Sequence, residues 1–310
     1  MILAFTPNPA FDETYIAPRL QLDASHRVSL QHRQAGGKGV NVAKVLHSQG
    51  IPVRALCPLG GDTGELFATQ LRGENVQLVQ VPVSAATRRS MAFHDAQANI
   101  TSVFNESGQP LSAAEWQGVE EEFARLLPEA QAVVVCGSWP TGTDFSRMQS
   151  LVNRATSQGI WTLVDTSGPN LLRAAECAAV LKPNEHELRE ATGCSTLAQG
   201  ARLLLERGAA EVFVSAGAAG IYHFTKNNER IAHAKLARTL QGNPTGAGDS
   251  AVAALAAGIV RGLDREQTLR LAVAWSAATV LMPMAGKLSP EHLGLLNESE
   301  YRLVDSAHMI

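Results

Sequence analysis

Short apolar segments alternate with helical segments through the second half of the chain, and this rhythm constrains the fold more than any other feature. Strands that are apolar on both faces are typical of a parallel sheet covered by helices on both sides. The sequence therefore predicts an α/β fold with a mainly parallel sheet. The expected strands are 132–136, 161–165, 179–182 and 211–215, and the expected helices are 144–157, 170–175 and 197–207.

Polar and glycine residues follow several of these strands. In open parallel sheets, ligands bind beyond the carboxyl ends of the strands, so one edge of the sheet is expected to carry the functional site. The segments that meet at this edge are 6–12, 137–138, 182–187 and 215–220, together with Asp165.

The composition is that of an ordinary globular protein, with 310 residues, 45% hydrophobic and 18% charged, and a net charge of -3. This net charge does not indicate a protein that binds nucleic acid. No apolar run reaches the roughly 18 residues that a membrane span needs. Segment 1–7 has no basic region, which disfavours a signal peptide. Four scattered cysteines lack the spacing of a zinc or disulfide framework and favour a cytoplasmic location: Cys57, Cys136, Cys177 and Cys194. Three histidines are expected on strand or loop surfaces, without a role: His94, His223 and His233.

Segment 242–250 reads Gly-Asn-Pro-Thr-Gly-Ala-Gly-Asp-Ser and leads into an alanine-rich run with strong helix propensity. Gly246, Ala247 and Gly248 are therefore expected at a helix N-terminus, where N–H groups and the helix dipole favour an anion. Asp249 falls in the first turn and can reach the same space. An anion hole beside a carboxylate suits phosphoryl transfer to a hydroxyl. An aspartate cap after a glycine turn explains a lone motif of this kind equally well.

A second glycine-rich segment, 34–46, opens an amphipathic helix that Gly50 and Pro52 close. Its glycines permit close backbone approach, Lys38 supplies a point charge, and Asn41 supplies a donor and an acceptor. These groups suit a polyhydroxylated or phosphorylated ligand. The spacing matches neither a Walker A loop nor the dinucleotide-binding glycine motif, so a nicotinamide enzyme is disfavoured.

Segment 182–188 allows two interpretations. Pro183 stops a strand, and Asn184 caps the following helix with Glu187 three residues later, as in a capping box. Local structure alone explains that pattern. In the functional interpretation, Asn184 and Glu187 face the cleft and hold Mg²⁺ through water, because Mg²⁺ dehydrates reluctantly.

Polar segments without a helical period fill much of the N-terminal third. Asp12 is expected in a turn beyond the opening strand. Segments 13–33 and 87–105 are expected to form short strands and a hairpin that make a flap. Arg88 and Arg89 begin the hairpin. Exposed strand arginines are usually solvated, but two beside a ligand suit a phosphate.

Taken together, these stretches resemble the ribokinase-like (PfkB) carbohydrate kinases over essentially the whole chain. The resemblance rests on five motifs in the family's order, at 6–12, 36–43, 137–142, 182–187 and 246–249. The first three look like the hexose-phosphate branch, and segment 105–108 leans toward its 1-phosphofructokinases. The resemblance implies one domain over 1–310 with a three-layer αβα sandwich. It also implies a β-stranded lid at about 13–33 and 87–105, through which a homodimer forms.

The resemblance further implies a role for each motif. Asp249 would take the proton from a substrate hydroxyl, while the amides of Gly246, Ala247 and Gly248 stabilise the transferring group. Mg²⁺ near Asn184 and Glu187 would bridge the phosphates of the co-substrate ATP. The residues implied for the sugar phosphate are Asp12, Gly37, Lys38, Asn41, Arg88 and Ser138, with Arg27 as a further phosphate ligand. The residues implied for the nucleotide are Lys182, Asn184, Ser215, Gly217, Gly220 and Thr245.

The chain departs from the family pattern in places that affect the substrate. Segment 87–90 reads Thr-Arg-Arg-Ser without the family's asparagine, which leaves the register of Arg88 and Arg89 open. Val103 stands where related enzymes often place a basic phosphate ligand, and segment 281–284 replaces a more polar stretch near the adenine.

The leading function is transfer from ATP to D-fructose 1-phosphate, which yields fructose 1,6-bisphosphate. The alternatives within the class are tagatose 6-phosphate, fructose 6-phosphate, and an unphosphorylated sugar or nucleoside. A non-catalytic sugar-phosphate sensor is the alternative from a different class. The presence of Asp249, Asn184 and Glu187 favours catalysis, because a sensor is free to lose them.

Overall fold

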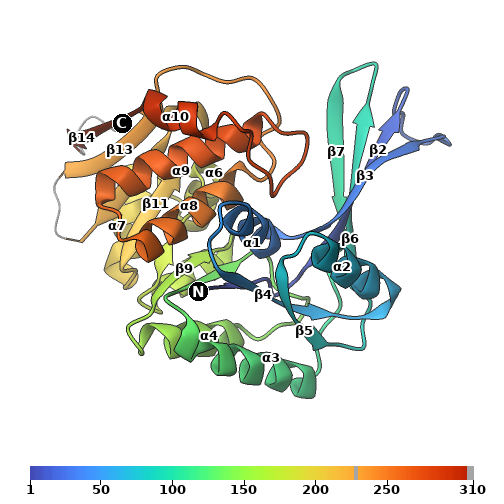
Figure 1. Cartoon of the computed structure of the whole chain (residues 1–310), viewed down its shortest axis with the longest axis horizontal. Helices are drawn as coiled ribbons and strands as arrows, with labels where there is room; N and C mark the ends of the chain where they lie inside the picture. The colour runs from blue at the N-terminus through green and yellow to red at the C-terminus, as the bar shows by residue number, and fades with distance from the viewer. Residues whose placement is uncertain (227–229, 306–310) are drawn as a thin grey trace.

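The computed structural model describes residues 1–226 and 230–305. Within them, one large sheet forms the body of the molecule and a separate four-stranded sheet projects from one side (Figure 1). The large sheet is mainly parallel, so the predicted α/β class is confirmed. The expected domain 1–310 includes 227–229 and 306–310, which lie outside the described residues.

Seven neighbouring strands of the large sheet, from β5 at one edge to β11, are parallel to one another. Beyond β11 the sheet continues with the antiparallel strands β12, β13 and β14. Strand β1 lies between β8 and β4 and is completely buried, as its apolar sequence dictates. In sheet order the strands are β14 (Ser299–Asp305), β13 (Arg230–Leu236), β12 (Ile221–Thr225), β11 (Glu211–Ser215), β10 (Val180–Leu181), β9 (Trp161–Asp165), β8 (Ala132–Cys136), β1 (Ile2–Phe5), β4 (Val53–Leu59) and β5 (Gln77–Pro82).

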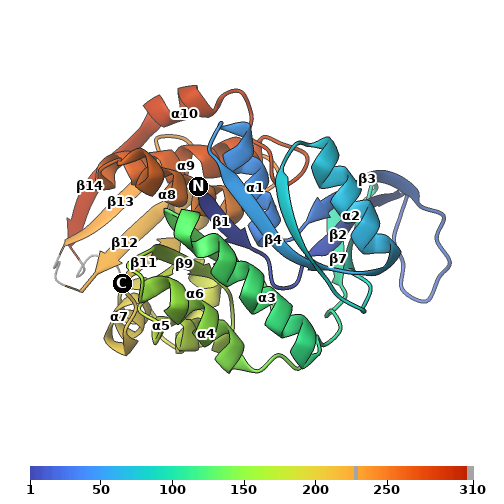
Figure 2. The same cartoon turned by 60° about the horizontal axis from the view of Figure 1, so that its bottom comes forward.

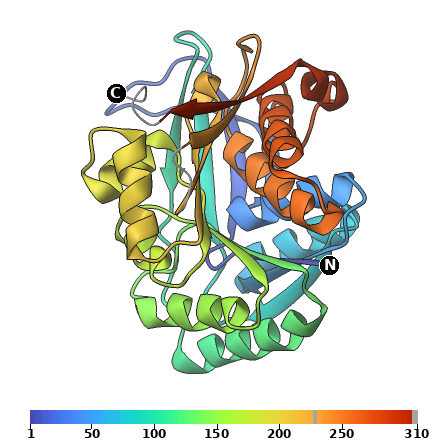
Figure 3. The same cartoon turned by 90° about the vertical axis from the view of Figure 1, so that its left-hand side faces the viewer.

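Helices cover both faces of this sheet, which gives the three expected layers (Figures 2 and 3). Each layer packs its apolar side chains into its own core cluster against the sheet. One layer contains α1 (Lys38–Ser48), α2 (Gly61–Gly73), α8 (Ala247–Arg261), α9 (Arg265–Val280) and α10 (His292–Glu298). The other contains α3 (Ala113–Leu126), α4 (Phe145–Thr156), α5 (Pro169–Ala175), α6 (Glu185–Thr192) and α7 (Leu197–Arg207).

The small sheet contains the segments expected to form a flap. Its order is β3-β2-β6-β7, with strands β2 (Ala10–Ala17), β3 (Ser29–Gly36), β6 (Arg88–Asp95) and β7 (Ile100–Asn105). The prediction that Asp12 lies in a turn is wrong. Asp12 lies inside β2 and pairs with Gln34 on one side and Ser90 on the other. Pairing with a strand almost eighty residues away overrides the local turn chemistry, and sequence patterns do not report such pairing.

Two of the three histidines expected on surfaces are buried instead. His223 is 5% exposed and His233 is 2% exposed, and each stacks on an aromatic ring of the sheet. Polar groups at such depth need hydrogen-bond partners, and both imidazoles have one. None of the helices within the described residues has the length and hydropathy to cross a membrane.

Helix α2 offers a matched test of the packing, because two of its leucines differ mainly in burial. Leu71 is completely buried, whereas Leu66 is 48% exposed. Leu71→Ala is expected to lower the free energy of unfolding by about 2–5 kcal/mol, because it removes buried methyl groups and leaves a cavity. Leu66→Ala is expected to lower it by less than about 1 kcal/mol. Urea denaturation checks both, and equal losses would contradict the described packing.

Candidate active site

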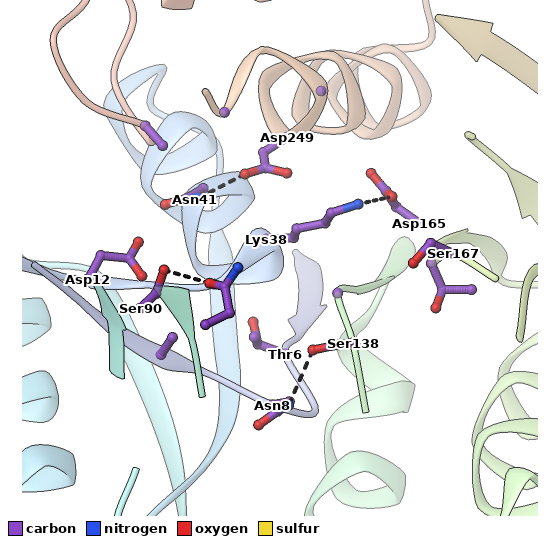
Figure 4. Close-up of a pocket in the computed structure, with 18 of the residues that line it drawn as sticks. Thr6, Asn8, Asp12, Lys38, Asn41, Ser90, Ser138, Asp165, Ser167 and Asp249 are labelled. Atoms are coloured by element: carbon purple, nitrogen blue, oxygen red, sulfur yellow. Dashed lines mark hydrogen bonds and ion pairs between the residues drawn. The ribbon is translucent and has the colours of Figure 1, made fainter. Parts of the chain in front are cut away.

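A polar cavity of about 830 Å³ lies where the small sheet faces the carboxyl edge of the large sheet. The side chains around it come from segments far apart in the sequence (Figure 4). The residues predicted for the site that line this cavity are Asp12, Gly37, Lys38, Asn41, Arg88, Ser138, Lys182, Asn184, Glu187, Ser215, Thr245, Gly246, Gly248 and Asp249. The predicted Arg27 is exposed and does not line it.

The N-terminus of α8 forms one wall of the cavity. Gly246 precedes the helix with a φ of +83°, and a Cβ there would lie 2.5 Å from the Cβ of Ala285, so only glycine fits. Asp249 follows in the first turn, is 7% exposed, and accepts a hydrogen bond of 2.8 Å from Asn41 Nδ2 (Figure 4). The carboxylate is therefore held at the positive end of a helix and oriented from α1.

The three backbone amides predicted as an anion hole are not equivalent. The N–H of Ala247 donates to the carbonyl of Pro244 at 3.1 Å, so its role in the anion hole stays a prediction. This bond closes the turn that starts α8. Within the described residues, the N–H groups of Gly246 and Gly248 have no backbone acceptor, and both residues line the cavity. The space for an anion is therefore next to Gly246 and Gly248.

Burial changes the acidity of two carboxyl groups in the cavity. Desolvation raises the pKa of Asp249 from 3.8 to about 6, although Lys38 opposes the shift. Desolvation likewise raises the pKa of Asp12 to about 7, against the opposing charges of Arg88 and Lys44. A carboxylate with a pKa of about 6 is ionised at neutral pH and is a stronger base than an exposed aspartate.

Lys38 lies at the centre of an ionic network. Its Nζ lies 2.8 Å from Asp165 Oδ1 (Figure 4). The same Nζ lies 3.3 Å from Glu187 Oε1. Lys182 Nζ lies 3.5 Å from the other carboxylate oxygen of Asp165. Burial opposes the charge of Lys38, but Asp165 and Glu187 outweigh it and raise its pKa. Lys38 therefore stays charged at the cavity wall.

Sequence reasoning placed Asp165 at the functional edge but gave it no role. It is 1% exposed, and Lys182 and Lys38 outweigh its burial and lower its pKa. Its position at the end of a buried strand was the available signal. Several uncharged residues of the cavity wall were also missed: Thr6, Ser90, Asn105, Ser107, Thr166 and Ser167.

The part of the cavity next to the small sheet contains the predicted sugar-binding groups. Arg88 lines the cavity and is fixed by bonds to the carbonyls of Asn8 and Glu106, at 3.2 and 3.0 Å. Arg89 does not line the cavity, and its Nε lies 3.9 Å from Glu13. Strand alternation explains the difference, since neighbours in a strand point to opposite faces. Asn8 Nδ2 also donates to Ser138 Oγ at 3.2 Å.

A second cavity, of about 410 Å³, lies on the other side of Gly248 and Ser215, which line both. The predicted Gly217 and Gly220 line it, as does Ala247. Its lining is more apolar because α9 contributes Val273, Ala277 and Val280. An apolar cavity joined to a polar one suits a ligand with a planar base and a charged end.

The segment predicted to hold Mg²⁺ forms the expected capping box. Asn184 Oδ1 accepts from the N–H of Glu187 at 2.8 Å, and Glu187 Oε2 accepts from the N–H of Asn184 at 2.9 Å. Among the described residues, His, Cys, Asp and Glu side chains form no cluster of three that could hold a metal ion. The donor set fits Mg²⁺ that keeps most of its waters, because such an ion needs only one or two protein oxygens.

The pKa of Asp249 predicts how stability depends on pH. The folded-state pKa is about 6 and the ordinary value is 3.8, so the unfolded chain loses this proton first as the pH rises. The stability that the raised pKa of Asp249 contributes is complete below pH 3.8 and is therefore lost as the pH rises through 6. Relative to Asp249→Asn, the free energy of unfolding of the wild type is expected to fall by about 1 kcal/mol between pH 5 and 7.5. Urea denaturation at both pH values measures the difference in the free energy of unfolding between the wild type and the variant. An equal difference at the two pH values would show that the carboxyl group titrates normally.

The sequence and fold of the chain are similar to those of known sugar-phosphate kinases. The chain is 35% identical over 300 residues to the 1-phosphofructokinase of Xanthomonas campestris, covering 93% of this chain and 94% of that protein. It is 29% identical over 301 residues to the tagatose-6-phosphate kinase of Staphylococcus epidermidis, covering 94% and 96%. A tetrameric inhibited form of phosphofructokinase-2 from Escherichia coli superposes with a TM-score of 0.87, at 26% identity, covering 96% and 98%.

The family model described as pfkB family carbohydrate kinase matches residues 6–291, nearly the whole chain. The resemblance read from the motifs is thereby confirmed, as is the ribokinase-like architecture. The chain belongs to the pfkB family of carbohydrate kinases and is an ATP-dependent sugar kinase.

Proposed function

We propose that the protein transfers the γ-phosphoryl group of ATP to D-fructose 1-phosphate and yields D-fructose 1,6-bisphosphate. The observation that carries this proposal is the position of Asp249, a buried carboxylate with a pKa of about 6 at the junction of a polar and an apolar cavity. The acceptor sugar occupies the polar cavity and the nucleotide extends into the apolar one.

In the transfer step, Asp249 takes the proton from the substrate hydroxyl as its oxygen bonds to the γ-phosphorus. The bond from the γ-phosphorus to the bridging oxygen breaks, and ADP leaves with those electrons. The N–H groups of Gly246 and Gly248 donate to the transferring group, whose charge the α8 dipole also favours. Asn41 keeps the base in position through its 2.8 Å bond to the carboxylate.

Charged and polar groups beside the small sheet select a phosphorylated sugar. Arg88 donates to two backbone carbonyls and lines the cavity, where its remaining guanidinium N–H groups can donate to a phosphate. Asp12, with a pKa of about 7, accepts from sugar hydroxyls. Gly37 permits close approach, and Ser138 adds a hydroxyl. Lys38 contributes a charge between this region and the transferring phosphate.

The nucleotide side of the site uses the loop after β11 and the start of α8. Ser215, Gly217 and Gly220 line the second cavity, where the apolar side chains of α9 face the base. Lys182 and Thr245 line the first cavity and lie toward the phosphates.

The capping-box residues Asn184 and Glu187 also line the first cavity and would hold Mg²⁺ through water. When bound, Mg²⁺ neutralises part of the phosphate charge.

The choice of substrate within the family follows the relatives. The relative at 35% identity is named a 1-phosphofructokinase, and the relative at 29% a tagatose-6-phosphate kinase, which makes tagatose 6-phosphate the second candidate. A sugar-phosphate sensor without turnover has less support, because such a protein needs no buried base with a raised pKa beside an anion site.

The small sheet has features of a lid that dimerises. Large apolar side chains are exposed on it, among them Ile100 at 60%, Val103 at 56% and Phe104 at 57%. Exposed apolar strands favour association, and β3 and β7 are edge strands. We infer that two copies cover these surfaces in a homodimer, and that the enzyme works in the cytoplasm.

The substrate proposal predicts the outcome of an ADP-release assay with Mg-ATP and a panel of acceptors. Turnover is expected on phosphorylated acceptors, because Arg88 and Lys38 line the cavity and can bind a phosphate. Among them fructose 1-phosphate is expected to be preferred, because the relative at 35% identity is named a 1-phosphofructokinase. The panel also contains fructose 6-phosphate, tagatose 6-phosphate, fructose and adenosine. Preference for tagatose 6-phosphate would select the second candidate. Turnover only on fructose or adenosine would contradict the proposed phosphate-binding role of Arg88 and Lys38. No ADP release with any acceptor would favour a non-catalytic sugar-phosphate sensor.

The neighbouring arginines of β6 provide a matched pair of variants. Arg88→Ala is expected to raise KM for the sugar phosphate roughly 10- to 100-fold, because it removes a charge-assisted hydrogen bond. KM for ATP is expected to change little. Arg89→Ala is the control and is expected to leave both values within about 2-fold. Steady-state kinetics measure all four constants, and equal effects of the two variants would mean that Arg88 does not bind the sugar phosphate.

A further inference from the structure

His233 lies in the middle of β13, beneath the loop that follows β11, and is 2% exposed. Its Nε2 lies 2.6 Å from the carbonyl oxygen of Ala219, in the loop, and its Nδ1 lies 3.2 Å from Arg302 Nε. The imidazole stacks on Tyr222, with ring centroids 4.2 Å apart and 12° between the planes. Three strands therefore hold one buried ring in place, and nothing in the phosphoryl-transfer step uses it.

The partners of the ring fix its tautomer. A guanidinium group can only donate hydrogen bonds, so Nδ1 must accept from Arg302. The proton of the neutral ring is then on Nε2, which donates it to the carbonyl of Ala219. Burial lowers the pKa of His233. The hydrogen bond to Ala219 opposes this shift, whereas the charges of Arg302 and Lys235 act in the same direction as burial. The ring is neutral at neutral pH, with both nitrogens satisfied.

The loop above His233 forms part of the wall of the second cavity. It contains the 3₁₀ turn Gly217–Ala219, whose residues are exposed, and the N–H of Ala216 closes its base on the carbonyl of Gly220 at 2.9 Å. A Cβ on Gly220 would lie 2.1 Å from the carbonyl oxygen of Ala234, so the loop rests directly on the β13 backbone. Consecutive residues of β13, His233 and Ala234, thus support consecutive residues of the loop.

We propose that His233 is a positioning residue for the nucleotide: its Nε2–H group holds the carbonyl of Ala219 and so fixes the loop 216–220 in the shape that ATP binds. This inference rests on the proposed assignment of the second cavity to the nucleotide. His233 does not touch the nucleotide in this account. The hydrogen bond from His233 orders this exposed, glycine-rich loop before ATP binds. The free-energy cost of ordering the loop on binding is therefore lower.

Two substitutions separate the donor from the ring. In His233→Gln, the side-chain amide reaches as far as Nε2 and can donate to Ala219. In His233→Asn, the amide is one carbon shorter and does not reach. His223 provides the control, since it is also a buried histidine stacked on an aromatic ring, Phe213, and its Nε2 partner is Glu211 rather than the loop.

Isothermal titration calorimetry with Mg-ATP alone gives the Kd for each folded variant. His233→Asn is expected to raise the Kd roughly 3- to 10-fold through the loss of one hydrogen bond. His233→Gln is expected to stay within about 2-fold of the wild type, and His223→Asn to leave the Kd unchanged. In steady-state assays, His233→Asn is expected to raise KM for ATP while kcat and KM for the sugar stay within about 2-fold.

Wild-type affinity in His233→Asn, or equal weakening in the Asn and Gln variants, would overturn the proposal. A fall in kcat together with a rise in both KM values would indicate general loss of structure and would also overturn it. If His233→Asn does not fold, hydrogen exchange of the 216–220 amides in His233→Gln decides, and exchange faster than in the wild type contradicts the proposal. The calorimetry needs no sugar, so a wrong choice of sugar phosphate leaves this test intact, whereas wild type that does not bind Mg-ATP would refute the nucleotide assignment itself.

Discussion

The ion pair between Lys38 and Asp165 is the interaction on which the arrangement of the site depends. It joins the start of α1 to the end of β9, at 2.8 Å across 127 residues of sequence. Lys38 contacts the carboxylates of Asp165 and Glu187, and its charge also acts on Asp249. Buried carboxylates of like charge are costly without nearby cations. Lys38 and Lys182 provide those cations. An incoming polyanion then finds ammonium groups already held at the edge of the sheet, with little reorganisation needed.

The same balance explains why one aspartate can act as a base and its neighbour cannot. Asp165 lies between two lysines, and its pKa is lowered despite complete burial. Asp249 is farther from compensating charge, and burial raises its pKa to about 6. Two carboxyl groups in one cavity therefore differ in basicity because of their partners rather than their depth. We place proton transfer at Asp249 for this reason.

The large sheet was predictable because its signal is local. Buried parallel strands are apolar throughout, and the expected segments 161–165 and 211–215 match β9 and β11. The glycine motif at α8 was predictable for the same reason, since a helix start has a local sequence signature. Which of Arg88 and Arg89 faces the cavity was not predictable, because the direction of a side chain depends on strand register. The placement of Asp12 in a strand and the burial of His233 depend on long-range pairing in the same way. The hydrogen bond of the Ala247 amide to Pro244 was not predictable either, because it depends on the backbone geometry of the turn.

The central claim is that Asp249 is the base of a phosphoryl transfer, and its substitution by asparagine tests this most directly. Asparagine keeps the size of the side chain and an oxygen that can accept from Asn41, but it cannot take a proton at neutral pH. The measurement is the single-turnover rate of Mg-ATP consumption with saturating sugar phosphate, alongside the Kd for Mg-ATP. The rate is expected to be lower than that of the wild type by roughly 10²- to 10⁴-fold, with an unchanged Kd. A rate close to that of the wild type would contradict this expectation and remove Asp249 from the mechanism.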